Sequence, residues 1–186
     1  MIILTSYGFR SPFVCTKIRK YINPKRKSIT IIPFARPNEE ITVKYEKNAL
    51  EDFGFSDIHF LTRESTVLND TDYIYVPGGD TFRLLHILKE TGLLDEIKRL
   101  VEHGKASYIG VSAGAYMCCK DIEYVKSLED DNYNISDYTA MGLITENIVC
   151  HSDQISMGDI ASIKSHNPER PLHLIRNDDV YFIEDI

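Results

Sequence analysis

The chain has 186 residues, of which 43% are hydrophobic and 26% are charged, and its formal net charge at pH 7 is -7. This length and composition are ordinary for one folded globular unit, so we expect residues 1–186 to form a single domain. The acidic charge argues against a nucleic-acid partner, because phosphate binding needs a basic surface, and no apolar run approaches the roughly 18 residues of a membrane span.

Short apolar segments alternate with longer amphipathic segments over the first two thirds of the chain. The predicted strands cover residues 2–5, 28–33, 57–61, 73–76 and 106–109. The predicted helices cover residues 13–21, 39–53, 81–88 and 93–103. Strands that alternate with helices of about ten residues are typical of βαβ units. The sequence therefore predicts an α/β fold with a mainly parallel sheet.

Two further expectations concern single elements. In the helix over 39–53, the face that we expect to be buried carries four residues, Ile41, Tyr45, Ala49 and Phe53. After residue 120 the alternation loosens, with a short strand over 148–150 and a helix over 155–165. The last two strands, over 172–175 and 180–183, are predicted to pair around a turn at 177–179.

The strongest local signal is Gly-Val-Ser-Ala-Gly at residues 110–114, which directly follows an apolar run. Gly-x-Ser-x-Gly after a strand is typical of a nucleophile elbow, a sharp turn that leads from a strand into a helix. The hydroxyl of Ser112 is then exposed beside the first backbone N–H groups of the helix. Gly110 and Gly114 suit such a turn because a side chain there would crowd the packing of the helix against the strand.

A second signal is the turn Pro-Gly-Gly-Asp-Thr at residues 77–81, between a strand and a helix. In a parallel sheet this turn lies at the same edge as the elbow, where open α/β sheets bind ligands. A serine hydrolase needs two N–H donors for its oxyanion. We expect the backbone N–H groups of Ala113 and Gly79 to supply them.

A serine nucleophile also needs a base, and six histidines are available. His151 directly follows a short predicted strand, so its ring can project over the elbow of a neighbouring strand. His166 lies near a predicted loop and is the next candidate. Sequence position alone favours His151 over His166 by a small margin.

The cysteines and the N-terminal residues indicate the cellular compartment. The four cysteines, at positions 15, 118, 119 and 150, lack the spacing of a zinc site, and two of them are adjacent. Reduced thiols in a cytoplasmic protein are the simplest account. The N-terminal residues look like a first strand and not like a signal peptide. No metal-ligand cluster or cofactor motif is present, so we predict neither a metal nor a cofactor.

Taken together, these residues resemble peptidase family S51, which contains aspartyl dipeptidase (dipeptidase E) and cyanophycinase. The Gly-Gly-Asp-Thr-Phe turn at 78–82, the Gly-x-Ser-Ala-Gly-Ala elbow at 110–115, and His151, 39 residues after Ser112, follow the family's order. The resemblance spans nearly the whole chain. The chain departs from the family pattern at Pro77, where a third glycine is usual.

The resemblance implies a three-layer fold like that of class I glutamine amidotransferase domains, a flavodoxin-like arrangement with helices on both faces of the sheet. It implies Ser112 as nucleophile, His151 as general base, and the backbone of Gly79 and Ala113 as oxyanion hole. It also implies a small peptide substrate, because the dipeptidase branch removes an N-terminal aspartate from dipeptides.

The third member of the implied catalytic triad is open. The family uses an acidic residue, often in the terminal strand-turn region, and we favour Asp178 there. Asn177 beside it is an alternative that can orient a histidine but cannot stabilise an imidazolium by charge. Glu123 and Asp121, which follow the elbow, are further alternatives.

Three other functions compete with a serine dipeptidase. The same site serves an esterase or amidase that acts on a non-peptide acyl substrate. A catalytically degenerate family member would bind a ligand without turnover. A cysteine-based amidotransferase is disfavoured because the elbow carries serine. A homodimer is compatible with the sequence, which does not fix the oligomeric state.

Overall fold

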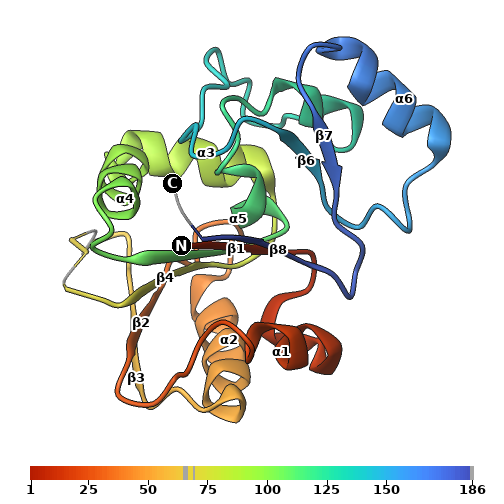
Figure 1. The fold of residues 1–186 in the computed structure, drawn as a ribbon. Coiled ribbons are helices and arrows are strands. Elements are labelled where there is room, and N and C mark those ends of the chain that lie inside the picture. The colour runs from red at the N-terminus through yellow and green to blue at the C-terminus, as the bar shows by residue number, and fades with distance from the viewer. Residues whose placement is uncertain (65–66, 69, 185–186) are drawn as a thin grey trace.

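The computed structural model describes residues 1–64, 67–68 and 70–184 (Figure 1). The strands of its central sheet are β1 (Ile2–Thr5), β2 (Ser28–Ile31), β3 (Asp57–Phe60), β4 (Tyr73–Val76), β5 (Ser107–Val111) and β8 (Val180–Ile183). Their order in the sheet is β3-β2-β4-β5-β1-β8. β8 runs antiparallel to β1, whereas the other neighbouring strands are parallel. The mainly parallel sheet expected from the sequence is confirmed.

Helices cover both faces of this sheet (Figure 1). α1 (Pro12–Ile18) and α2 (Glu39–Phe53) lie on one face. α3 (Thr81–Glu90), α4 (Leu93–Glu102) and α5 (Ala113–Tyr116) lie on the other. The three-layer α/β fold is therefore confirmed, and the predicted elements occur with ends that differ by a few residues. Within the described residues, no helix is both long enough and apolar enough to span a bilayer.

The layers follow from the two-residue period of the strands, which sends successive side chains to opposite faces. Ile2 and Leu4 of β1 join the cluster under α3 and α4, whereas Ile3 joins the cluster under α1 and α2. All three side chains are fully buried. The inner strands β1, β4 and β5 therefore read as nearly continuous apolar runs, as expected for parallel strands that are covered on both sides, whereas the edge strand β3 is mostly exposed.

The buried face of α2 differs from the predicted one. Its buried residues are Thr42, Glu46, Leu50 and Phe53, of which only Phe53 belongs to the predicted face. Ile41 and Tyr45 are instead 51% and 64% exposed. The helix is rotated because Glu46 is satisfied inside: the Tyr75 hydroxyl donates to its carboxylate at 2.6 Å, and Arg10 lies 3.6 Å away. A buried charge with such partners is tolerated where hydrophobicity alone predicts an apolar side chain.

A second, smaller sheet lies beyond α5 (Figure 1). It pairs β6 (Asn147–Val149) with β7 (Leu172–Leu174) in parallel, and α6 (Met157–His166) connects them. Short 3-10 helices span Gly8–Arg10 and Glu123–Ser127. The predicted pairing of the last two strands is wrong, because β7 pairs with β6 whereas β8 crosses to the main sheet beside β1. The turn between them therefore joins two sheets.

Candidate active site

Ser112 lies at the junction of β5 and α5, with φ 49° and ψ -109°. A residue other than glycine rarely adopts a positive φ, and such a conformation costs about 1–3 kcal/mol. The strain is maintained by the surroundings, since the Ser112 N–H donates to Thr5 O at 2.9 Å. α5 is short and ends at Tyr116. The structure thus has the elbow that the sequence predicts.

Close backbone contacts explain the two glycines of the elbow. A Cβ on Gly114 would lie 2.8 Å from the carbonyl carbon of Val76 and closer still to the oxygen. A Cβ on Gly110 would lie 2.7 Å from Gly114 O. Val76 and Gly110 are register partners of β4 and β5. Glycine at both positions therefore lets α5 approach the ends of the two strands.

His151 follows β6, and its ring faces the elbow. Its Nε2 lies 3.2 Å from the Ser112 Oγ, which is hydrogen-bond distance. Its φ is 55°, so both residues of this pair have left-handed backbone conformations. The Tyr7 ring packs edge-on against the imidazole, with centroids 5.2 Å apart. The side chain of His166, the other candidate, lies outside the described part of the structure.

The residue against the far side of the His151 ring is Asn177. Its Oδ1 lies 2.7 Å from His151 Nδ1. Our choice of Asp178 for this position is wrong: its carboxylate instead accepts a hydrogen bond from the Ser11 hydroxyl at 3.1 Å. Neighbouring residues in the turn after β7 point in different directions, and the turn directs Asn177 to the histidine.

The two acids after the elbow are also engaged elsewhere. Asp121 forms an ion pair with Arg170 at 2.8 Å. Glu123 lies 3.6 Å from Lys126. These contacts exclude both residues as direct partners of the histidine in this structure, so the group that contacts Nδ1 is an amide and not an acid.

Two hydroxyl groups that the sequence analysis missed hold the histidine segment in place. The buried Ser6 Oγ accepts from the His151 N–H at 2.9 Å and donates to Ile175 O at 3.0 Å. Ser6 therefore joins the segments that follow β1, β6 and β7. From α5, the Tyr116 hydroxyl accepts from the Cys150 N–H at 3.1 Å. A lone serine or tyrosine carries no sequence signal for such a role.

The glycine turn after β4 lies beside the elbow. A Cβ on Gly78 would be 3.0 Å from the Ser112 Cβ. A Cβ on Gly79 would be 2.7 Å from the carbonyl carbon of Ala35, so that position has no space for a side chain. Within the described residues, the backbone N–H groups of Gly79 and Ala113 have no protein hydrogen-bond acceptor. Both donors are therefore free to bind a ligand.

A cavity of about 540 Å³ lies along α2, and the described residues that line it include Glu46 but not Gly78, Gly79, Ser112 or His151. Arg10 and Arg36 are among its lining residues, and the Arg36 Nε donates to Gly78 O at 3.0 Å. The sequence gives no reason to prefer these arginines, because each follows a different strand. Arg10 is paired with Glu46, which lines the same cavity, so Arg36 is the guanidinium that links this cavity to the glycine turn.

The three thiols near the elbow are buried, which disfavours their charged thiolate form. Burial raises the pKa of Cys119 to about 11 and the pKa of Cys150 to about 12. Burial also holds the pKa of Cys118 well above its ordinary value. All four cysteines are free. Because the thiolate is the reactive form of cysteine, burial makes these thiols poor nucleophiles at neutral pH.

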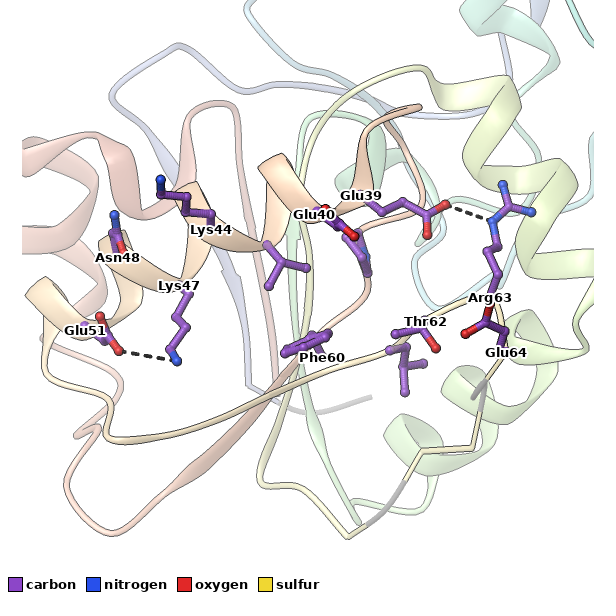
Figure 2. Close-up of a pocket in the computed structure, with 13 residues that line it drawn as sticks. Glu39, Glu40, Lys44, Lys47, Asn48, Glu51, Phe60, Thr62, Arg63 and Glu64 are labelled. Atoms are coloured by element: carbon purple, nitrogen blue, oxygen red, sulfur yellow. Dashed lines mark hydrogen bonds and ion pairs between the residues drawn. The ribbon is translucent and has the colours of Figure 1, made fainter.

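Another cavity, of about 630 Å³, lies between α2 and the segment that follows β3 (Figure 2). Figure 2 shows Lys44 and Lys47 on the helix side, and Phe60 and Arg63 on the opposite side. Arg63 is held by Glu39 at 2.8 Å. The described residues that line this cavity include neither member of the Ser112–His151 pair, so it is separate from the elbow.

Comparison with known proteins identifies the family of this chain. Residues 2–185 match the model of peptidase family S51. An uncharacterized peptidase of Listeria monocytogenes is 31% identical over 173 residues, which are 87% of this chain and 84% of that protein. A Drosophila melanogaster protein, named a probable alpha-aspartyl dipeptidase, is 32% identical over 98 residues, which are 52% of this chain and 41% of that protein.

The fold is shared with a solved structure. A Listeria monocytogenes protein, described as a candidate peptidase E, superposes with a TM-score of 0.80 at 29% sequence identity. The superposition covers 98% of this chain and 93% of that chain. With the family matched over nearly the whole sequence and the architecture shared, this chain belongs to peptidase family S51 and is a serine-type peptidase.

Proposed function

We propose that this peptidase is an aspartyl dipeptidase that cleaves dipeptides with an N-terminal aspartate through an acyl-enzyme on Ser112. The observation that carries the proposal is the continuous chain of contacts from Ser112 Oγ to His151 and from His151 to Asn177, at 3.2 and 2.7 Å. A hydroxyl, an imidazole and an orienting group in this order are the parts that nucleophilic acyl transfer requires.

In the first half of the reaction, Ser112 Oγ attacks the peptide carbonyl while His151 Nε2 takes the hydroxyl proton. The backbone N–H groups of Gly79 and Ala113 bind the oxyanion that forms. The peptide C–N bond then breaks, and His151 returns the proton to the leaving amine. The free state of both donors within the described residues supports their part in this step.

In the second half, His151 takes a proton from water, and the resulting hydroxide attacks the acyl ester on Ser112. The same two N–H groups bind the second oxyanion. The ester bond breaks, the proton returns to Ser112 Oγ, and free aspartate leaves. Asn177 keeps the imidazole in the orientation that both halves need, through the 2.7 Å contact with Nδ1.

The aspartate preference has two supports. One is the dipeptidase name of the Drosophila relative. The other is Arg36, whose Nε donates to Gly78 O in the glycine turn and whose side chain lines the neighbouring cavity. A substrate carboxylate in this cavity would be close to a guanidinium, which binds carboxylates through paired hydrogen bonds.

The test is hydrolysis of Asp-Leu, Ala-Leu and Glu-Leu by the wild type and by Ser112→Ala. We expect cleavage of Asp-Leu alone, and a loss of at least about 10⁴-fold in the variant, as for other serine nucleophiles. Equal cleavage of all three dipeptides would overturn the aspartate preference. Cleavage of p-nitrophenyl acetate with no dipeptide cleaved would favour an esterase. Unchanged turnover in Ser112→Ala would overturn the mechanism.

A further inference from the structure

A carboxylate lies directly behind the histidine's amide partner. Asp153 follows His151 by two residues, and both of its oxygens bind Asn177. The Asn177 backbone N–H donates to Oδ1 at 3.1 Å, and its side-chain Nδ2 donates to Oδ2 at 3.0 Å. Asp153 therefore binds both the main chain and the side chain of the residue that contacts the catalytic ring.

These two hydrogen bonds to Asp153, which we call the Asp153 clamp, determine which end of the Asn177 amide faces His151. A carboxylate only accepts hydrogen bonds, so it selects the NH₂ end of the amide. The carbonyl end is left for the histidine, 2.7 Å from Nδ1. A carbonyl in turn accepts only from a protonated Nδ1, so Nε2 carries no proton in the neutral ring. That is the form that can accept the Ser112 hydroxyl proton.

The carboxylate also has a charge that the amide lacks. Within the described residues, no cationic side chain lies within 4 Å of Asp153, so an ion pair does not neutralise it. Hydrogen-bonded groups in a chain polarise one another, which strengthens the carbonyl of Asn177 as an acceptor. Because Asp153 is exposed, we expect orientation to contribute more than charge.

We propose that Asp153 is a positioning residue of this active site, acting through Asn177 to fix the His151 tautomer and to oppose the positive charge of the imidazolium. The chain Ser112–His151–Asn177–Asp153 replaces the direct histidine–acid contact of a Ser-His-acid triad. The inference rests on the proposed function for its kinetic consequences, but its effect on the ring proton is independent of any substrate.

The first experiment measures the ring proton directly. Nitrogen-15 NMR distinguishes the two neutral tautomers of a histidine, at about pH 9, where histidine side chains are usually neutral. We expect one tautomer, protonated at Nδ1, for His151 in the wild type and a mixture in Asp153→Ala, in which the amide is free to flip. His151→Gln identifies the signal among the six histidines. An unchanged signal in Asp153→Ala would overturn the proposal.

Asp178→Ala is the matched control. Asp178 is also an exposed acid beside Asn177, but its carboxylate binds Ser11 and not the amide. We expect this variant to keep the wild-type tautomer. If Asp178→Ala and Asp153→Ala changed the signal equally, the effect would arise from general loss of negative charge and the clamp would be refuted.

The second experiment is kinetic and exchanges the two groups. Asp153→Asn alone sets an NH₂ group against the Asn177 backbone N–H, and we expect kcat to fall about 10- to 100-fold, as for partners that orient metal-bound histidines. We expect KM to change little. Asn177→Asp alone places two carboxylates in contact, which is also unfavourable. The double variant has a carboxylate against the ring and an amide behind it.

We therefore expect Asp153→Asn to lower kcat in the wild type and to raise it in the Asn177→Asp background. A merely structural role for Asp153 would give losses in both backgrounds and would refute the proposal. Failure of the proposed function looks different: the wild type would cleave no dipeptide, while the NMR arm would still show the tautomer change in Asp153→Ala. If the wild type showed dipeptidase activity but Asp153→Ala kept the wild-type tautomer, the positioning role of Asp153 would be refuted and the proposed function would stand.

Discussion

Gly114→Ala is the substitution that most directly tests how the elbow is assembled. Gly114 lies in α5, two residues after Ser112, and a Cβ there would meet the main chain of Val76. The carbonyl carbon would be 2.8 Å away, whereas carbon atoms in contact prefer about 3.5–4.0 Å. Because the neighbour is backbone at the end of β4, no side-chain rotation can relieve the clash.

The required displacement is therefore on the order of 1 Å between α5 and β4. Overpacking a well-filled core costs about 1–3 kcal/mol, and a backbone neighbour brings the cost to the upper end, about 3 kcal/mol. For a chain of this size, each kcal/mol lowers Tm by about 2–4 °C, so we expect a decrease of about 6–12 °C. The same displacement moves Ser112 away from the glycine turn. We therefore expect dipeptide hydrolysis to fall even at temperatures at which the variant remains folded.

The assay is thermal unfolding followed by circular dichroism, together with dipeptide hydrolysis well below Tm. Gly158→Ala is the control, because Gly158 lies in α6 and a Cβ there would meet nothing closer than Ser156 Oγ at 3.6 Å. The helix gains about 0.5–1 kcal/mol from alanine, so Tm should rise slightly. A Tm for Gly114→Ala within about 2 °C of the wild type would refute the argument from close packing.

Two other substitutions test electrostatic features. Burial raises the pKa of Glu129, whose carboxylate accepts from Thr81 N at 3.2 Å. An acid whose pKa is raised by folding destabilises the folded state when it is ionised. We therefore expect Glu129→Gln to raise the free energy of unfolding at pH 7, as measured by urea titration. This gain should vanish below the usual glutamate pKa, where the carboxyl group is protonated in both states. A gain that grows at low pH would contradict this sign. Arg36→Ala should lower kcat/KM for Asp-Leu about 10- to 100-fold, the value of a charge-assisted hydrogen bond. An unchanged kcat/KM would contradict a role for Arg36 in binding the aspartate side chain.

The sequence alone predicts those features of this protein that depend on contacts between neighbouring residues or on the burial of whole strands. The glycines around Ser112 are required by contacts within a few residues and with one neighbouring strand, so the motif predicts the elbow. The inner parallel strands are apolar on both faces because helices cover both faces of the sheet, so their continuous apolar runs predict strands. The serine at the elbow and the alternation of strands and helices were therefore accessible before the structure. The position of the histidine after β6 favoured it only by a small margin, and the resemblance to family S51 singled it out.

The tertiary structure decided what depends on contacts between distant segments. Asn177 and Asp178 are adjacent, and only the crossing from β7 to β8 directs one to His151 and the other to Ser11. The buried face of α2 depended on Glu46, whose partner lies in β4. Periodicity predicts which side chains share a face, but it does not identify the partner that makes a buried charge stable. That information arises only when the strands are in register and their ends meet.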